Sequence, residues 1–233
     1  MNDADVVVIG GTTGLGFEVA RHYADAGRRV ILTGRDPERA ATAAAELGDR
    51  TVGLGFDLSE PAVIAPALAE VGRVDRLVLA GIDRDQNLVR EYNPASAVRL
   101  VTQKLVGYTE VVHALSDRLH DDSSILIFGG LAKERPYPGS TTVTTVNHGV
   151  DGLVRAMSFE LKPIRVNALH PGIVGDSPFW SGKTEALEAV RARAATGRWV
   201  TMADVVDAAV FLLENPSVSG TELRVDGGWS LPW

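Results

Sequence analysis

The sequence contains no cysteine, which excludes disulfides and thiolate metal sites and fits a reducing cytoplasm. It has no apolar run close to the ~20 residues that cross a bilayer, and its first residues lack the basic-then-apolar order of a signal peptide. Basic residues form no stripe with interleaved aromatics, and the net charge is -7, so nucleic acid is not an expected partner. We therefore expect a cytoplasmic protein with no membrane segment and no metal site.

What is present is a regular alternation of short β-branched runs and longer segments of helical period. This pattern is typical of an α/β fold, in which parallel strands are covered on both faces by crossover helices. At 233 residues, we expect one domain over 1–233. The expected strands are Val6–Ile9, Arg29–Thr33, Thr51–Gly55, Arg76–Ala80, Ser124–Phe128, Ile164–Leu169 and Glu222–Val225. The expected helices are Gly14–Ala26, Pro37–Leu47, Pro61–Val71, Pro94–Leu119, Thr141–Leu161, Lys183–Thr196 and Met202–Leu213.

A glycine-rich turn, VVVIGGTTGLGFEVA, places Gly10, Gly14 and Gly16 between a buried strand and the start of a helix. A phosphate there meets free backbone N–H groups and the positive end of the helix dipole, and small residues permit its close approach. The alternative is an ordinary tight turn, but the surrounding strand–helix–strand pattern favours dinucleotide binding. The hydroxyls of Thr12 and Thr13 are candidate donors to that ligand.

The second strand ends in Gly34-Arg35. An acidic residue at this position usually binds the ribose hydroxyls of NAD, whereas an arginine favours the extra phosphate of NADP. Asp36 precedes Pro37 and is interpreted as a helix N-cap. We therefore predict that NADP binds through Arg35 in preference to NAD, with no acidic side chain opposing the phosphate. The alternative is that Arg35 is a solvated surface residue.

Five motifs occur in order along nearly the whole chain: the Gly-x-x-x-Gly-x-Gly loop, Asp57-Leu58, Leu79-Ala80-Gly81, IRVNALHPG and VDGG. Together they resemble the short-chain dehydrogenase/reductase family. The resemblance implies one Rossmann-like, doubly wound parallel sheet of about seven strands, an NAD(P) cofactor, and a homotetramer or homodimer. It also implies that Asp57 and Leu58 contact the adenine, although Asp57 can equally cap a helix before Pro61. The cofactor-binding residues expected in addition are Leu15, Ala80, Gly81, Asn147, Pro171, Gly172, Val174 and Asp176.

The same resemblance draws attention to four positions where this family usually has asparagine, serine, tyrosine and lysine. The tyrosine and lysine are four residues apart, which places both on one face of a helix. In this sequence Lys104 stands for the asparagine, Gly130 or Gly129 for the serine, Val143 for the tyrosine and Asn147 for the lysine. We interpret this as an atypical active site. The simplest alternative is a pseudoenzyme.

Three side chains are candidates for the proton donor. Lys104 comes first, provided that burial lowers its pKa, and Asn147 can still bind the nicotinamide ribose through its amide. Tyr137 lies in the loop KERPYPGS, where a surface position is the alternative. His170 lies at the carboxyl end of a strand, where ligands bind in such sheets, with a structural histidine as the alternative.

The predicted function is an NADP-dependent oxidoreductase that reduces a small organic carbonyl, imine or activated alkene. The alternative is a protein that binds the nucleotide without redox turnover, as a sensor, scaffold or non-redox catalyst. The resemblance implies a substrate-covering segment near 176–200, with Asp176 beside the carboxamide. Phe179 and Trp180 are then either pocket walls or core residues.

Assembly is suggested by two long helices that carry apolar residues on more than the sheet-facing side, namely Val111, Val112, Leu115, Val150, Leu153 and Met157. By the resemblance, a second subunit covers them; the alternative is one broad buried face in a monomer. The terminal Trp229 and Trp233 either reach a neighbouring subunit or fold back.

Overall fold

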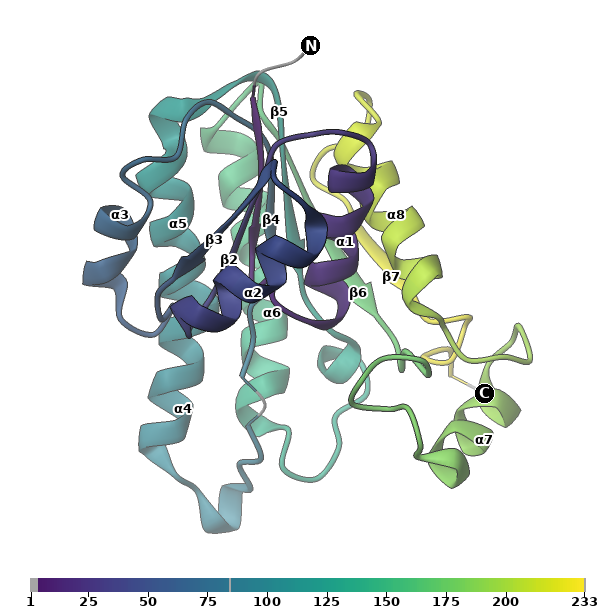
Figure 1. The fold of residues 1–233 in the computed structure, drawn as a ribbon. Helices are drawn as coiled ribbons and strands as arrows, with labels where there is room; N and C mark the ends of the chain where they lie inside the picture. The colour runs from purple at the N-terminus through teal and green to yellow at the C-terminus, as the bar shows by residue number, and fades with distance from the viewer. Residues whose placement is uncertain (1–3, 84, 233) are drawn as a thin grey trace.

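The computed structural model describes residues 4–83 and 85–232. It contains a parallel sheet of seven strands, in the order β3-β2-β1-β4-β5-β6-β7, between two layers of helices (Figure 1). The strands are β1 Asp5–Ile9, β2 Val30–Gly34, β3 Thr51–Gly55, β4 Val74–Leu79, β5 Leu119–Phe128, β6 Arg165–Pro171 and β7 Glu222–Val225. This confirms the predicted Rossmann-like, doubly wound fold. The strand order reverses between β1 and β4, and such a switch point opens a crevice at the carboxyl ends of the strands.

Helices α1 (Gly14–Asp25), α2 (Pro37–Leu47) and α8 (Met202–Glu214) pack on one face of the sheet. The other face is covered by α3 (Ile64–Ala67), α5 (Tyr108–Leu115) and α6 (Thr141–Glu160). Sequence explains the helix starts: Asp36 accepts the N–H groups of Glu38 and Arg39 ahead of α2, as predicted, and Thr201 and Asp204 form a capping box at α8.

Two predicted helices differ from the structure. The segment predicted as the helix Pro61–Val71 forms only a 3-10 turn, Pro61–Val63, and the four-residue α3. The segment predicted as Pro94–Leu119 divides into α4 (Pro94–Val101), a π-helical turn (Thr102–Gly107), α5 and a 3-10 turn (Ser116–Arg118). The apolar period continues through the π-helical turn, which holds one extra residue, so the sequence does not predict the interruption. Helix α7 covers Thr184–Arg193, and no helix among the described residues has the length and apolarity needed to cross a membrane.

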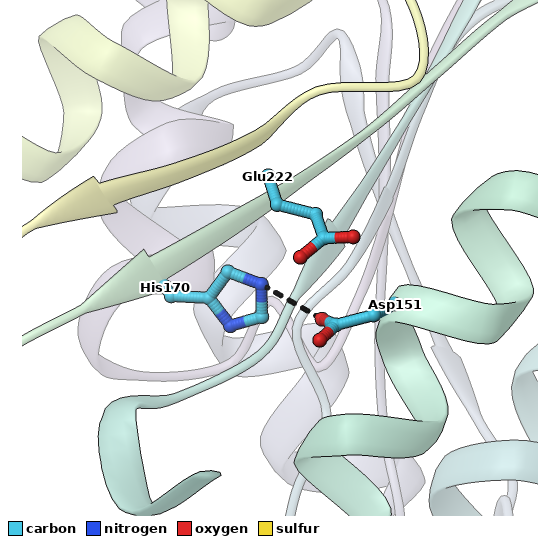
Figure 2. Close-up of side chains that lie close together, drawn as sticks. All are labelled: Asp151, His170 and Glu222. Carbon is cyan, nitrogen blue, oxygen red and sulfur yellow. Dashed lines mark ion pairs between the residues drawn. The ribbon is translucent and has the colours of Figure 1, made fainter. Parts of the chain in front are cut away.

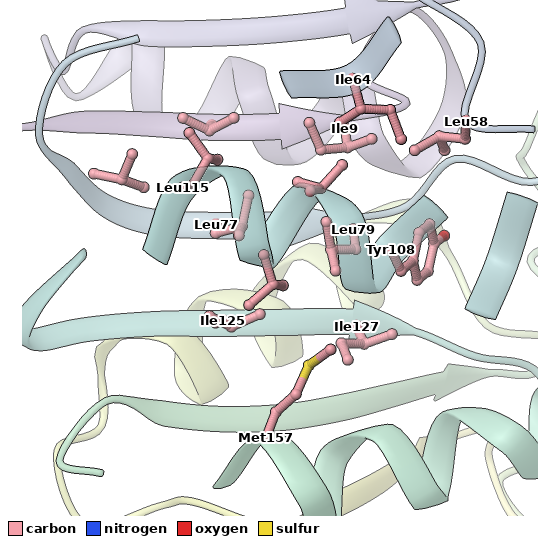
Figure 3. Close-up of a cluster of buried hydrophobic side chains, with 14 of the residues drawn as sticks. Ile9, Leu58, Ile64, Leu77, Leu79, Tyr108, Leu115, Ile125, Ile127 and Met157 are labelled. Carbon is pink, nitrogen blue, oxygen red and sulfur yellow. The ribbon is translucent and has the colours of Figure 1, made fainter. Parts of the chain in front are cut away.

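Alternation along the strands builds two cores. In β1, Val6 and Val8 face α1, α2 and α8, whereas Val7 and Ile9 face the opposite helices. Figure 3 shows the second core, where Ile9, Leu79 and Ile127 meet side chains of α5 and α6.

The apolar residues that suggested a subunit interface belong to this same core. Val111, Val112, Leu115, Val150 and Met157 are buried within one chain, and Leu153 is half-buried against them. The alternative of one broad buried face is therefore correct for these residues.

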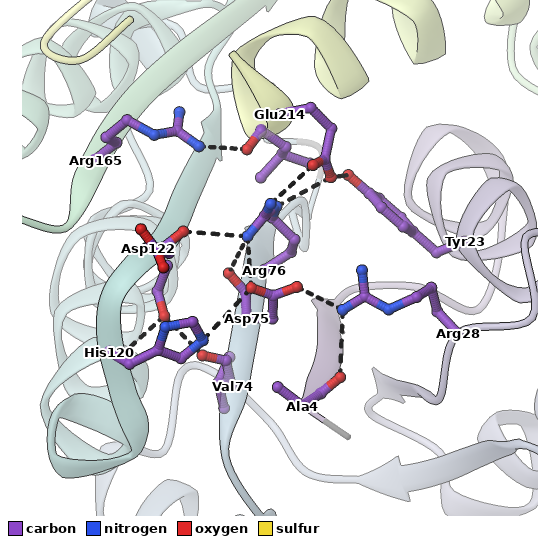
Figure 4. A network of polar contacts seen from close by, with 12 residues as sticks. Ala4, Tyr23, Arg28, Val74, Asp75, Arg76, His120, Asp122, Arg165 and Glu214 are labelled. Carbon is purple, nitrogen blue, oxygen red and sulfur yellow. Dashed lines mark hydrogen bonds and ion pairs between the residues drawn. The ribbon is translucent and has the colours of Figure 1, made fainter. Parts of the chain in front are cut away.

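The amino ends of the strands carry a polar network (Figure 4). Glu214, the last residue of α8, accepts hydrogen bonds from Arg76 in β4 and from the hydroxyl of Tyr23 in α1. Arg76 also pairs with Asp75, which accepts a second arginine, Arg28. This network ties both helices to the sheet at the edge opposite the crevice.

Candidate functional site

The turn between β1 and α1 is shaped by two glycines in close contact with their neighbours. A Cβ at Gly10 would lie 2.4 Å from the Cα of Gly81, and a Cβ at Gly16 would lie 2.3 Å from the carbonyl oxygen of Gly10. Gly10 also has a φ of 81°, which disfavours other residues. The turn therefore rests directly on the end of β4.

Gly14 also has a positive φ, 59°, but no described atom lies within 4 Å of where its Cβ would be. Thr13, the N-cap of α1, makes no side-chain capping bond, and Leu15 beside it is half-buried. The first N–H groups of α1 thus face open space, which suits an anion such as a pyrophosphate. Thr12 packs against Gly34 at the end of β2.

The end of β2 presents Arg35 as an exposed side chain, but an acid does lie beside it. Its Nη1 is 3.0 Å from Oδ2 of Asp83, which follows β4. The expectation that no acidic side chain opposes a phosphate at Arg35 is therefore wrong. The two residues are 48 apart in sequence, so only the pairing of β2 and β4 with β1 reveals their contact.

The end of β3 presents Asp57, which contacts a helix across the crevice. Its carboxylate accepts the N–H and hydroxyl of Ser59 and a guanidinium N–H of Arg99 in α4. Partial burial acts to raise the pKa of Asp57, but these hydrogen bonds outweigh it and hold the pKa below its usual range. The N-cap before Pro61 is Glu60, so the alternative that Asp57 caps this helix is wrong.

Leu58 and Gly81 form the floor between β3 and β4. Leu58 is buried, and a Cβ at Gly81 would lie 2.9 Å from its side chain. The hydroxyl of Tyr108 in α5 donates to the carbonyl of Gly81 at 2.7 Å, while Ala80 continues the hydrogen bonding of β4 to Ile9. Tyr108 thereby connects the segment after β4 to the start of α5, next to the π-turn.

Lys104 lies in that π-turn and is 1% exposed. Its ammonium makes no hydrogen bond to any described residue; its nearest aromatic neighbour is the ring of Tyr108, with Nζ 5.7 Å from the centroid. Burial lowers the pKa of Lys104 to about 7, because the charged form loses its hydration. Lys104 therefore changes protonation near neutral pH, as a general acid must.

Asn147 lies in α6 with its amide buried. Its Oδ1 has no hydrogen-bond partner among the described residues, and a Cβ at Gly130 would lie 2.9 Å from its Nδ2. The amide thus fills the space that a side chain at position 130 would need, and it leaves one acceptor available for a hydroxyl. Val143, one turn earlier, is half-buried and offers no polar group.

His170, at the end of β6, is fully buried. Its Nδ1 accepts the N–H of Gly130 at 3.1 Å, so the neutral ring carries its proton on Nε2, which lies 3.4 Å from Oδ1 of Asp151 (Figure 2). Burial and the nearby Lys133 lower the pKa of His170 to about 4. The ring is therefore neutral at neutral pH. It also fills the space beside Gly129, where a Cβ would lie 2.2 Å from the ring.

A half-buried charge cluster lies beside this histidine. Nζ of Lys133 lies 2.7 Å from both carboxylate oxygens of Asp151 and 3.1 Å from Oε2 of Glu222. Asp151, His170 and Glu222 are close enough together to hold a metal ion, but the ammonium of Lys133 already binds both carboxylates. Sequence reasoning missed this cluster. The one available signal was Asp151, one helical turn after Asn147 and so on the same face.

The remaining predicted residues follow β5 in the chain or lie at and after the end of β6. Tyr137 is 51% exposed in its loop, as its alternative held. Pro171 ends β6 and Gly172 follows it, and Val174 is buried beside Val200. Asp176 is exposed and accepts the N–H of Met202 at the start of α8, so one of its oxygens is already engaged.

The segment after β6 ends in aromatic residues and a helix. Phe179 is exposed and lies edge-on against Trp180, with Lys183 over both rings, so the core alternative is wrong for Phe179. At the chain's end, Trp229 stacks under Arg135 and its carbonyl accepts from Arg193. This part of the tail folds back on its own chain, and Trp233 lies outside the described residues.

Comparison with known proteins identifies the architecture. Residues 10–230 match the family model described as enoyl-(acyl carrier protein) reductase. The chain is 33% identical to the 3-oxoacyl-[acyl-carrier-protein] reductase of Bos taurus, covering 98% of this chain and 99% of that one. The chain belongs to the short-chain dehydrogenase/reductase family. It is also 30% identical to carbonyl reductase family member 4 of Danio rerio, with 97% of each chain covered.

A solved structure of this family agrees with the fold. A "short chain dehydrogenase/reductase family protein" superposes with a TM-score of 0.87 at 26% identity, covering 98% of each chain. Membership in this oxidoreductase family makes the crevice above β1 and β4, with the turn of Gly10 to Gly16 at its base, the candidate active site.

Proposed function

We propose that this short-chain dehydrogenase/reductase is an NADPH-dependent reductase of a small organic carbonyl, imine or activated alkene, with Lys104 as its proton donor. The observation that carries the proposal is the buried ammonium of Lys104, which has no hydrogen bond to a described residue and a pKa lowered by burial to about 7. The names of the relatives, 3-oxoacyl reductases and a carbonyl reductase, favour a carbonyl among the three substrate classes.

The residues fit a dinucleotide at each point of the crevice. The open N-terminus of α1 at Gly14 suits the pyrophosphate, Arg35 the 2′-phosphate, and the floor at Leu58 and Gly81 the adenine side. The unpaired Oδ1 of Asn147 is free to accept from a ribose hydroxyl. The remaining proposed contacts follow the family pattern: Thr12, Thr13, Leu15, Asp57, Ala80, Pro171, Gly172, Val174 and Asp176.

Bound NADPH would supply the hydride, so the chain must bind the substrate, exclude water and provide one proton. Protonated Lys104 donates that proton to the substrate atom on which negative charge develops, and stabilises this charge beforehand. Tyr137 is mostly exposed, and the ring proton of neutral His170 faces Asp151. These placements favour Lys104 over the other two. We further propose that residues 176–200 cover the substrate.

The experiment offers NADPH and a panel of ketones, aldehydes, imines and activated alkenes to the protein and follows the loss of NADPH absorbance. Consumption that depends on substrate and protein supports the proposal. NADPH that binds without being consumed would favour the second function, nucleotide binding without redox turnover. The observation behind that alternative is that Lys104, Gly130, Val143 and Asn147 stand where the family usually has its acid-base residues.

Cofactor preference is tested separately by titrating NADPH and NADH against the parent and Arg35→Ala. We expect NADPH to bind more tightly to the parent by about 1.5–3 kcal/mol, the size of a charge-assisted contact, and the variant to lose this difference. Equal affinities of the parent for both cofactors would contradict the assignment.

We also propose that the protein works in the cytoplasm as a homodimer or homotetramer. The absence of cysteine supports a reducing compartment, and family membership supports assembly.

A further inference from the structure

Charged side chains meet at the carboxyl ends of β2, β3 and β4, where Arg35, Asp57, Asp83 and Arg99 form ion pairs with one another. We propose that Arg35 and Arg99 form a two-arginine clamp for the 2′-phosphate of NADP(H), and that the carboxylate of Asp83 occupies this clamp in the free protein. The inference rests on the proposed NADPH binding and adds two specificity-determining residues, Arg99 and Asp83, that the glycine-rich turn and the end of β2 do not predict.

Both arginines donate to the same carboxylate oxygen of Asp83. Oδ2 of Asp83 lies 3.0 Å from Nη1 of Arg35 and 3.3 Å from Nη2 of Arg99. The two guanidinium groups come from different elements, the end of β2 and α4, and converge on this point. Two converging arginines form a site for an anionic oxygen, and a phosphate presents three such oxygens where a carboxylate presents two.

Arg99 is already held in place on its other side. Its Nη2 lies 2.8 Å from Oδ2 of Asp57, and its Nη1 donates to the hydroxyl of Ser59. The hydrogen bond to Asp57 raises the pKa of Arg99 above its ordinary value, so the group stays charged. A guanidinium fixed by Asp57 loses little freedom when it binds a further anion, which favours affinity.

The structure also permits Asp83 to leave the clamp. Its backbone N–H donates to Oε1 of Gln103 at 3.0 Å, a bond that holds the chain here and does not depend on where the side chain lies. The side chains of Arg35 and Arg99 are 58% and 41% exposed, and ion pairs at such exposure contribute little stability. A dianionic phosphate with more acceptor oxygens therefore competes well for the two arginines.

The test uses two fragments that differ only in the 2′-phosphate: adenosine 2′,5′-bisphosphate and adenosine 5′-monophosphate. Both are titrated calorimetrically at low ionic strength against the full chain and the variants Arg99→Met, Asp83→Asn and Arg35→Met. Arg50→Met is the matched control, because Arg50 is exposed and lies at the amino end of β3, whereas the clamp lies at the carboxyl ends of the strands.

We expect Arg99→Met to weaken the bisphosphate at least ~10-fold, as for one lost charge-assisted contact, and the monophosphate less than ~3-fold. Asp83→Asn should tighten the bisphosphate several-fold and leave the monophosphate unchanged, because a competing negative charge is removed. Arg50→Met should change neither ligand.

Two results would overturn the clamp. If Arg99→Met weakens both fragments equally, Arg99 serves the adenine edge through Asp57 and not the phosphate. If Asp83→Asn weakens the bisphosphate, Asp83 supports the site rather than occupying it. In either case a preference of the parent for the bisphosphate that Arg35→Met abolishes leaves the proposed NADP binding intact. A parent with no such preference would contradict the NADP assignment as well.

Discussion

A lysine that is 1% exposed and makes no hydrogen bond to a described residue is costly to the folded chain. Its ammonium gives up hydration without a partner, and such groups persist where a function requires them. The residue type at position 104 is visible in the sequence, but its burial depends on the π-turn. The sequence therefore identified the candidate, and only the fold supplied the reason for its lowered pKa.

At this scale we predict that Lys104→Met lowers kcat/KM at least ~100-fold, the size typical of a lost acid-base group, while NADPH affinity stays within a few fold. The parent should lose activity for reduction as pH rises through about 7, because the proton donor is then deprotonated. The pH–activity profile of the variant should lack this fall near pH 7. Lys162→Met, at an exposed lysine after α6, serves as the control. Unchanged turnover in Lys104→Met would move attention to Tyr137, His170 or water.

The same substitution should stabilise the fold. The folded pKa of about 7 lies below the ordinary 10.5, so between these pH values the unfolded chain binds a proton that the folded chain does not. Stability from this group therefore rises with pH across that window. At pH 7 Lys104→Met should raise the free energy of unfolding by on the order of 4 kcal/mol, and the gain should shrink towards pH 10.5. Urea unfolding at several pH values measures it; a destabilised variant at pH 7 would contradict the cause given for the pKa.

Elements were predicted best where one local signal determined them. All seven strands were found because short apolar runs alternate with segments of helical period, and α2 was found to the residue because Asp36 and Pro37 mark its start. The segment from Pro94 to Arg118 was not, because its apolar period continues through a turn of different geometry. What a helix packs against, rather than its own pattern, decides such interruptions.

The docking of α8 on the sheet gives a prediction at this scale. Arg76 donates to Glu214 from Nε at 3.0 Å and from Nη2 at 2.7 Å, and Tyr23 adds a bond at 2.7 Å. Glu214→Gln removes the negative charge that pairs with the largely buried guanidinium of Arg76. The variant should therefore have a free energy of unfolding lower by about 1.5–3 kcal/mol. Tyr23→Phe should cost about 1 kcal/mol.

Chemical denaturation measures both variants. Cofactor affinity should not change in either, since the network lies at the strand edge opposite the crevice. Equal stability of Glu214→Gln and the parent would mean that this ion pair contributes nothing to the docking of α8.

The whole molecule brings together residues that no local pattern relates. Asp83 contacts Arg35 and Arg99, and Lys133 contacts Asp151 and Glu222, although these residues are separated in the sequence. The folded chain brings them together. The crevice itself was predictable, since its position follows from the doubly wound topology. Its charge pattern was not, and this is why the acid opposite Arg35 was missed.

Assembly also belongs to this scale, and the structure changes which residues bear on it. The apolar residues first assigned to an interface are buried within one chain, whereas Val106 in the π-turn and Phe159 in α6 are 49% and 71% exposed. Family membership and these exposed side chains lead us to expect a dimer or tetramer whose contact includes them.

Light scattering at micromolar concentration should therefore give a multiple of 24.8 kDa. Val106→Glu should shift the mass towards one chain, because a carboxylate buried in an apolar contact is unfavourable, whereas Val52→Glu, at an exposed valine of β3, should not. A parent mass near 24.8 kDa would contradict the assembly, and an oligomer unaffected by Val106→Glu would place its interface elsewhere.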